Sequence, residues 1–346
     1  MSHFVVKTLN SDQTLHQAWD HFVDQCANGH FFHLSGWKTV IEQAYNHQCH
    51  FLYAEQDGNI VGVLPLVHQK SRLFGNALIS TPFCVYGGVA SDNPEVMDFL
   101  EQQAIELAER LQVDYLELRY PFARNNSLET RSQHVTFGCE LGTDGDAILA
   151  AVKKKQRAVI RHSLNNDLAY TINDDVALSY QIYSESVRNL GTPVFPKQYF
   201  QILKKVFQDR CEVLTVHHQD NPVSSVLSFY YKGQVLPYYG GGTPEARNLK
   251  SNDFMYYQLM CHARVEKACS YYDFGRSKID SGAYNYKKHW GMDAKPLFYQ
   301  YHLVKAQSLP NLSPNNPKYK LFISLWQKLP IGLSRLIGPF LSKYLG

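Results

Sequence analysis

The sequence predicts a mixed α/β protein in which one structural unit occurs twice and a basic, apolar tail follows. Two hairpin patterns predict the duplication, because residues 51–67 and 213–230 each place two apolar runs around a polar turn. Each hairpin is followed by a Tyr-Gly-Gly cluster, a helical pattern and a short strand. These segments are 86–88, 96–111 and 114–118 in the first half, and 239–242, 253–268 and 271–274 in the second. Since the turn and glycine signatures recur together with the order, we favour duplication over a chance succession of elements.

A chain of 346 residues is long enough for two hydrophobic cores, which agrees with the duplication. We expect a first domain at 1–145, a second domain at 146–305, and a linker and tail at 306–346. A single helix is predicted over the basic segment 147–166, after a polar loop and cap at 142–145.

The composition excludes several classes of protein. A formal net charge of +3 is too small to indicate nucleic-acid binding by itself. The seven cysteines lack CxxC spacing, so we predict neither a disulfide framework nor a metal site. Residues 1–12 show no secretory signal pattern, and no apolar stretch is long enough to cross a bilayer, which together predict a cytoplasmic protein.

The segment 271–291, YYDFGRSKIDSGAYNYKKHWG, is the most informative for chemistry. We expect a strand that breaks at Gly275, which would leave Arg276 and Lys278 at its carboxyl end. Active sites of open α/β sheets collect at such ends. Gly282 is then expected to free the backbone before a cluster of aromatic and lysine residues. Basic side chains beside glycine and aromatic residues suit an anion clamp, and we favour this over a solvated surface loop.

A glycine-rich segment near the end of the second hairpin offers a second candidate. In LPYYGGGT, the hydroxyls of Tyr238 and Tyr239 precede Gly240 and Gly241, where a ligand can approach the backbone closely. A β-bulge at the end of a strand is the alternative.

Three further segments have both a structural and a functional interpretation. The first-half loop 83–88 could mirror the glycine-rich segment through Tyr86, and its Cys84 is expected to be a buried thiol rather than a nucleophile. The segment 190–195, LGTPVF, is either a turn or a wall over a substrate. The basic run 153–162 is either a solvated helix face or a surface for a phosphate-rich substrate.

Seven motifs together resemble proteins of the FemAB family, and most closely the subgroup associated with the exosortase/PEP-CTERM system. They are IVGVLPL (60–66), LFG (73–75), TPFCVYGG (81–88), LGTPVFPK (190–197), LPYYGGG (236–242), DFGRSK (273–278) and GAYNYKKHWG (282–291). The resemblance implies tandem GNAT-like acyltransferase domains, the second also similar to the BioF2-like acetyltransferase domain. The chain lacks the coiled-coil insertion of some Fem enzymes and the Q/R-x-x-G-x-G/A loop of ordinary GNAT enzymes.

The resemblance also implies an activity. Fem enzymes transfer amino acids from aminoacyl-tRNA to a peptidoglycan precursor, and an exosortase context implies exopolysaccharide chemistry instead. We therefore expect an acyl- or aminoacyltransferase that acts on an amine or hydroxyl of a small-molecule or lipid-linked sugar or peptide precursor. Its donor would be acyl-CoA or aminoacyl-tRNA, with no permanently bound cofactor. The alternative is a non-catalytic, membrane-peripheral adaptor.

The resemblance assigns roles to individual residues. The family's aromatic-lysine pair matches Tyr286-Lys287, so Lys287 is expected to be the cation near the transition state. From their own side-chain chemistry, Arg276 and Lys278 are expected to clamp phosphate, and Tyr238 or Tyr239 to orient the acceptor or relay a proton. The remaining predicted substrate-binding residues are Tyr238, Tyr286, Gly240, Gly241 and Tyr86.

The tail at 318–346 carries five basic residues and neither Asp nor Glu. Its apolar residues recur at helical spacing up to Leu329, and Pro330 separates them from a second apolar stretch. Basic charge beside Trp, Phe and Leu is typical of an interfacial helix, which would place the protein at the inner membrane. A helical hairpin packed on the protein's own core is the alternative.

Overall fold

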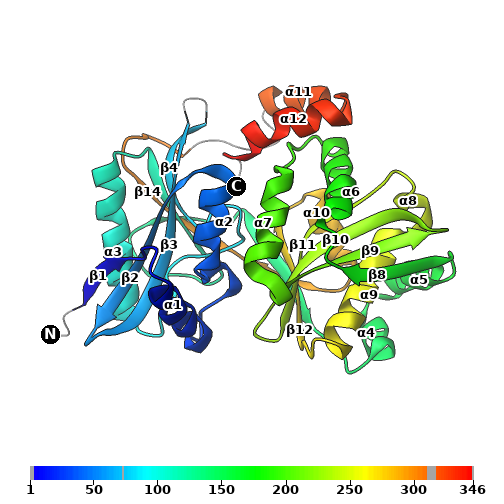
Figure 1. Ribbon diagram of the computed structural model, residues 1–346, viewed down its shortest axis with the longest axis horizontal. Helices are drawn as coiled ribbons and strands as arrows, with labels where there is room; N and C mark the ends of the chain where they lie inside the picture. The colour runs from blue at the N-terminus through cyan, green and yellow to red at the C-terminus, as the bar shows by residue number, and fades with distance from the viewer. Residues whose placement is uncertain (1–3, 72–73, 310–316, 345–346) are drawn as a thin grey trace. The chain divides into compact units, whose positions relative to one another are not determined.

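The structure is a computed structural model that describes residues 4–71, 74–309 and 317–344 (Figure 1). The predicted linker at 310–316 and the first residue of the LFG motif lie outside these ranges. Contacts divide the chain into two compact units. The first comprises Met1–Gln133, Pro296–Asn311 and Lys343–Gly346, and the second comprises His134–Lys295 and Leu312–Ser342.

The first unit is built on a seven-stranded sheet. In spatial order its strands are β1 (Val5–Thr8), β2 (Gln48–Gln56), β3 (Asn59–Ser71), β4 (Gly75–Ser80), β5 (Tyr115–Tyr120), β14 (Phe298–Leu303) and β6 (Glu129–Arg131). Helices α1 (Gln13–Gln25) and α2 (Gly36–Tyr45) precede the β2–β3 hairpin, and α3 (Pro94–Leu111) joins β4 to β5.

Alternation along β2 sorts its side chains between the two faces of this sheet. Leu52 and Ala54 belong to the apolar core that α3 covers. Phe51 and Tyr53 point the other way, because the ring of Trp19 on α1 packs against both. The sheet of the first unit is therefore covered by helices on both faces.

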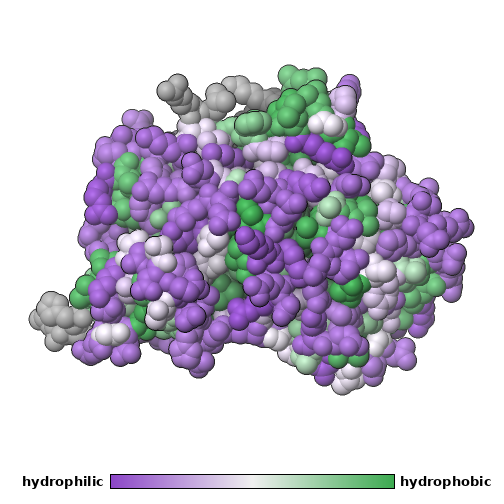
Figure 2. All heavy atoms as spheres, viewed as in Figure 1, coloured by the Kyte–Doolittle hydropathy of each residue, from purple (hydrophilic) through white to green (hydrophobic). Residues whose placement is uncertain are grey.

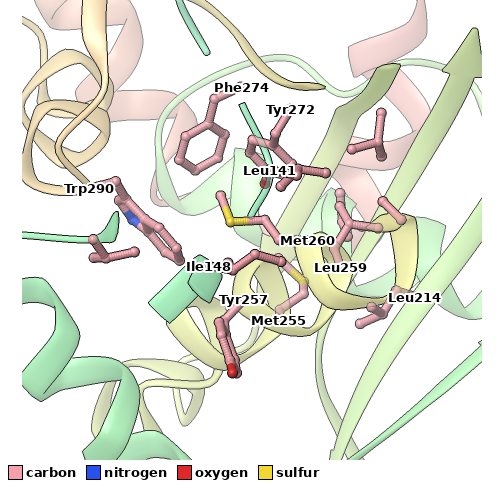
Figure 3. Packing of buried hydrophobic residues seen from close by; sticks show 14 of the residues in the cluster. Leu141, Ile148, Leu214, Met255, Tyr257, Leu259, Met260, Tyr272, Phe274 and Trp290 are labelled. Carbon is pink, nitrogen blue, oxygen red and sulfur yellow. The ribbon is translucent and has the colours of Figure 1, made fainter. Parts of the chain in front are cut away.

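The second unit repeats this design on its own seven-stranded sheet. In spatial order its strands are β13 (Asp293–Pro296), β7 (His134–Glu140), β12 (Tyr271–Lys278), β11 (Gln234–Gly242), β10 (Asn221–Tyr231), β9 (Cys211–His218) and β8 (Leu168–Asn173). Helices α6 (Val176–Asn189) and α7 (Lys197–Phe207) precede the β9–β10 hairpin, and α9 (Ser251–Val265) joins β11 to β12. Figure 3 shows Met255, Leu259 and Met260 of α9 packed with Tyr272 and Phe274 in the core of this unit.

The predicted duplication is confirmed, and it extends further than the sequence indicated. The order β1, α1, α2, β2, β3, β4, α3, β5 recurs as β8, α6, α7, β9, β10, β11, α9, β12. Both hairpin turns match as well, since Asp57–Gly58 and Gln219–Asp220 all have positive φ, as expected for a type I′ turn. Each order also ends in one parallel pair of strands, β4 with β5 and β11 with β12.

Each sheet also contains two strands from outside the repeated order, β14 and β6 in the first unit and β7 and β13 in the second. β14 pairs antiparallel with β5, and β7 pairs antiparallel with β12. Residues 134–140 therefore belong to the second unit and residues 298–303 to the first. The predicted domains at 1–145 and 146–305 are each continuous in the sequence and do not include this exchange of strands. Their limits remain a prediction.

The predicted helix over 147–166 is wrong in one respect, because it consists of two helices. α4 (Gly145–Ala151) ends before Val152, whose ψ of 142° is extended, and α5 (Lys154–Leu164) begins two residues later. The Arg157 guanidinium donates hydrogen bonds to the carbonyls of Ala150 and Val152. This side chain therefore satisfies carbonyls that the end of α4 leaves without helical partners.

The expected break at Gly275 is also wrong. β12 continues through Lys278, because a register shift between Asp273 and Gly275 absorbs the glycine as a bulge with φ +77°. Gly282 opens helix α10 (Gly282–His289), and the Ser281 side chain caps it by accepting from the Tyr284 amide. In the first half, the segment 86–88 does not end a strand, since β4 already ends at Ser80.

Gly88 has a steric role in the first unit. A Cβ there would stand 2.4 Å from the ring of Tyr120, which is buried and hydrogen-bonded through its hydroxyl to Glu101. We expect Gly88→Ala to lower the free energy of unfolding by about 1–3 kcal/mol, because the ring cannot move aside. Gly332→Ala is the matched control, since nothing lies within 4 Å of a Cβ at that position. Equal melting temperatures of the two variants would contradict this role.

The tail forms two helices, α11 (Pro317–Trp326) and α12 (Ile331–Ser342), and most of it belongs to the second unit. α12 contacts α6, and the backbone of Gly338 lies against Val194. Packing on the protein itself, one of the two predicted alternatives, is therefore present. Among the described residues, no helix is long and apolar enough to cross a membrane.

Candidate functional site

The parallel pair β11–β12 separates near its start. Only Gln234 with Tyr271 and Val235 with Tyr272 are in register as partners. Beyond these residues β11 pairs only with β10, and β12 pairs only with β7, within the described part of the sheet. The two strands are therefore not paired with each other beyond Val235 and Tyr272, which is where a ligand can lie between them.

Lys287 on α10 lies against the bulge of β12. Its Nζ donates to the carbonyl oxygens of Gly275 at 2.9 Å and Arg276 at 3.1 Å, and it stands 5.3 Å from the ring centroid of Phe274. Burial lowers the pKa of Lys287 to about 8, the Asp273 carboxylate opposes this shift, and the Arg276 charge adds to it. An ammonium group has three N–H donors, so one remains for a ligand.

The bulge that receives Lys287 is held by Asp273. Its carboxylate accepts from the Thr136 hydroxyl at 3.0 Å and from the Gly275 amide at 2.9 Å. Asp273 is 5% exposed, so this bracing is shielded from water. The carbonyls that bind Lys287 are thus fixed by a buried carboxylate on the same strand.

Tyr286 contacts a buried acid that the sequence analysis missed. Its hydroxyl donates to Asp253 of α9 at 2.9 Å, and the Gln156 amide donates to the same oxygen at 2.6 Å. Burial raises the pKa of Asp253, and these two hydrogen bonds oppose that shift. The polar end of Tyr286 is therefore occupied inside the protein. An acid in the first turn of the helix after the glycine cluster was the available signal.

The predicted catalytic residue Tyr239 lies in an aromatic cluster between β11 and the helices α6 and α7. The cluster consists of Tyr183, Phe195, Tyr199, Phe200, Tyr238 and Tyr239. The hydroxyl oxygens of Tyr239 and Tyr199 are 2.7 Å apart. Burial, together with Tyr199 and Tyr238, holds the pKa of Tyr239 well above its usual value, so this group is neutral and suits a donor rather than a base.

A pair of variants separates the structural from the catalytic role of Tyr239. Tyr239→Phe and Tyr199→Phe each remove the same hydrogen bond, so each is expected to cost about 0.5–1.5 kcal/mol of stability. Only Tyr239→Phe should also lower the rate of acyl transfer, by about tenfold or more, if its hydroxyl orients the acceptor or relays a proton. Equal transfer rates in the two variants would make Tyr239 a packing residue.

Gly240 and Gly241 face opposite sides of the second sheet. A Cβ on Gly240 would stand 2.9 Å from the Tyr256 hydroxyl oxygen of α9, and one on Gly241 would stand 2.7 Å from Cβ of Ser186 on α6. Close helix packing therefore explains both glycines. The predicted β-bulge is also present, because the β10–β11 register shifts at Tyr238. Ligand approach at this segment remains a prediction.

The other predicted binding residues lie in two places. Arg276 and Lys278 are half-buried on β12, two residues apart, and Arg276 is close enough to Lys287 to influence its pKa. Tyr86 belongs to the first unit, where it is buried with its hydroxyl 2.6 Å from Nε2 of His30. The structure thus brings Arg276 close to Lys287, whereas the Tyr286 hydroxyl is directed to Asp253.

Comparisons with known proteins identify the domain that carries this site. Residues 128–288 match the family model for the acetyltransferase (GNAT) domain. The crystal structure of FemX superposes with a TM-score of 0.66 at 14% identity, covering 92% of this chain and 100% of that one. A tandem GNAT protein from the clavulanic acid biosynthesis pathway superposes with a TM-score of 0.52 at 11% identity, covering 88% and 100%. A comparison with curated proteins gives no significant sequence match.

These superpositions establish the fold, which is the tandem GNAT-like arrangement that the sequence predicted. The matched segment includes β12 and most of α10, and therefore Asp273, Arg276, Tyr286 and Lys287. Most of the second unit accordingly matches the acetyltransferase (GNAT) domain.

Proposed function

We propose that this chain transfers an acyl or aminoacyl group to an amine or hydroxyl, between β11 and β12 of the second unit, where the two strands are no longer paired with each other. The observation that carries the proposal is the position of Lys287, whose ammonium group is held by two backbone carbonyls of β12 in that region. A positive charge in a water-poor site stabilises the oxyanion that forms during acyl transfer more strongly than the same charge in water.

The reaction places few demands on the protein. The acceptor nitrogen or oxygen attacks the donor carbonyl carbon, a new C–N or C–O bond forms, and the carbonyl oxygen becomes an oxyanion. The oxyanion then collapses, the bond to the thiolate or alkoxide leaving group breaks, and the acceptor's proton goes to that leaving group. Lys287 would donate its remaining N–H to the oxyanion, and Arg276 and Lys278 would bind phosphate of the donor.

The donor and acceptor follow from the resemblance of the sequence. A GNAT domain favours acyl-CoA as donor, while the FemAB-like motifs favour aminoacyl-tRNA, and both present an activated carbonyl next to phosphate. For the acceptor we propose a cell-envelope or exopolysaccharide precursor, as the similarity to the PEP-CTERM-associated subgroup suggests. FemAB-family enzymes are the precedent for such an acceptor.

Two donor-binding measurements test this function. Coenzyme A, which is common to all acyl-CoA donors, is titrated calorimetrically, and a pool of aminoacylated tRNA is tested by filter binding. We expect the protein to bind one of the two, and Arg276→Ala with Lys278→Ala to weaken that binding about tenfold or more, since two phosphate contacts are lost. A protein that binds neither would be an adaptor and not a transferase.

A further inference from the structure

Helix α12 has its polar and apolar faces the opposite way round from an ordinary surface helix. The residues it buries are Ser334, Gly338 and Ser342, at a spacing of four. The residues it exposes are large and apolar, namely Leu333, Leu336, Ile337 and Phe340, with Leu336 at 66% and Phe340 at 73% exposure. A surface helix normally turns its apolar stripe to the core.

The buried face of α12 is fixed by specific contacts. Small residues let its backbone approach Val194 closely, and the Arg335 guanidinium donates to the Ser184 hydroxyl and the Gln181 carbonyl of α6. Arg335 also lies over the ring of Tyr180. The helix therefore cannot rotate its apolar stripe inward without losing these contacts.

Helix α11 extends the same apolar surface. Trp326 is buried at 4% exposure and Ile323 packs on Gly191, which fixes one side of the helix. Leu321 and Leu325 are 65% and 59% exposed. Figure 2 shows hydrophobic surface gathered over the α11–α12 hairpin.

This concentration sets the hairpin apart from the rest of the described surface. Of the fourteen large apolar residues exposed there, seven lie on α11 and α12. Single exposed apolar residues are normal, but a contiguous patch marks a surface that another apolar phase covers.

The charge of the segment identifies that phase. Residues 318–346 carry five basic residues and no acidic one. Arg335 is bound to α6, whereas Lys328, in the turn between the helices, is exposed. A protein partner would require complementary acids and a shaped interface, whereas an anionic bilayer requires only basic charge beside an apolar surface. We infer that the α11–α12 hairpin docks on an anionic lipid bilayer with its outer apolar stripe, while its inner face stays packed on α6.

This inference concerns binding and does not rest on the proposed acyl transfer. It is tested by flotation of the full-length protein with vesicles of phosphatidylcholine alone and of phosphatidylcholine with a minor fraction of phosphatidylglycerol. The probe variant is Leu336→Ser with Phe340→Ser, which changes only exposed side chains. The matched control is Leu164→Ser with Val265→Ser, which removes exposed apolar residues from α5 and α9 of the same unit.

We expect the wild-type protein to float with the anionic vesicles. The tail variant should bind these vesicles more weakly, by a factor of about ten or greater, and its melting temperature should not change. The control variant should bind like the wild type. Lys328→Ala should weaken binding about fivefold at low salt and less at high salt.

Three results would overturn the inference. The first is absence of flotation by the wild-type protein, and the second is equal flotation by the tail and control variants. The third is a concentration-dependent dimer in light scattering that the tail substitutions dissolve, with no vesicle binding. That result would assign the apolar stripe to a second copy of the chain.

Discussion

Replacing Lys287 by alanine is expected to lower the rate of acyl transfer about 10²–10³-fold, which corresponds to roughly 3–4 kcal/mol of lost transition-state stabilisation. The expectation rests on the two carbonyls that orient Nζ and on the burial that lowers its pKa to about 8. Stability should change little, because the variant loses two hydrogen bonds but also removes a charge from a poorly solvated site. Lys288→Ala is the matched control, since Lys288 is the exposed neighbour on the same helix.

The pH dependence of transfer tests the role of Lys287 independently. A cation that stabilises the oxyanion must be protonated, so the rate should fall as the pH rises through about 8. A general base would give the opposite profile, with a rate that rises towards pH 8. The Lys287→Ala variant should lose this inflection. A rising limb in the wild type would replace the proposed role by base catalysis.

The residues around Lys287 show which parts of the candidate site could be predicted from the sequence. The aromatic-lysine pair was identified by its resemblance to a family motif, and the structure brings Lys287 together with Arg276. Asp253 was not identified, because it lies 34 positions before Lys287 in the chain and only the packing of α9 against α10 brings its carboxylate to Tyr286. Single-sequence patterns record local periodicity and turns, whereas contacts between distant helices depend on the whole core.

The same distinction between local patterns and contacts of distant segments explains which parts of the fold could be predicted. The two hairpins were predictable, because an Asp-Gly or Gln-Asp turn between apolar runs is a local signal. The exchange of β7 and β14 was not predictable, since no local pattern decides which distant strand pairs with β5 or with β12 when the sheets form. The bulge at Gly275 was missed for a related reason. A glycine with positive φ either breaks a strand or is absorbed as a bulge, and pairing with β7 makes the second outcome the stable one.

The first unit has a different pair of charged residues at the position corresponding to Asp273 and Arg276. Glu117 stands two residues after the first paired residue of β5, as Asp273 does on β12. The Arg119 Nε donates to Glu117 at 2.6 Å, and its Nη1 donates to the Cys84 carbonyl at 2.8 Å. Both side chains are less than 10% exposed, at 4% and 9%. In this unit the arginine is therefore used to hold the loop that follows β4.

Arg119→Met is accordingly expected to destabilise the first unit by about 3–5 kcal/mol, because it leaves the Glu117 carboxylate buried without its cation. Arg131→Met is the matched control, since its pair with Glu129 has side chains 37% and 52% exposed and should contribute at most about 1 kcal/mol. Adding Glu117→Gln to Arg119→Met should recover part of the loss, because the uncompensated charge is removed. Hydrogen exchange of the β5 amides reports the stability of this unit directly. Equal exchange rates in the Arg119 and Arg131 variants would mean that the buried pair does not hold the loop, and that its position in the repeat is a remnant of duplication alone.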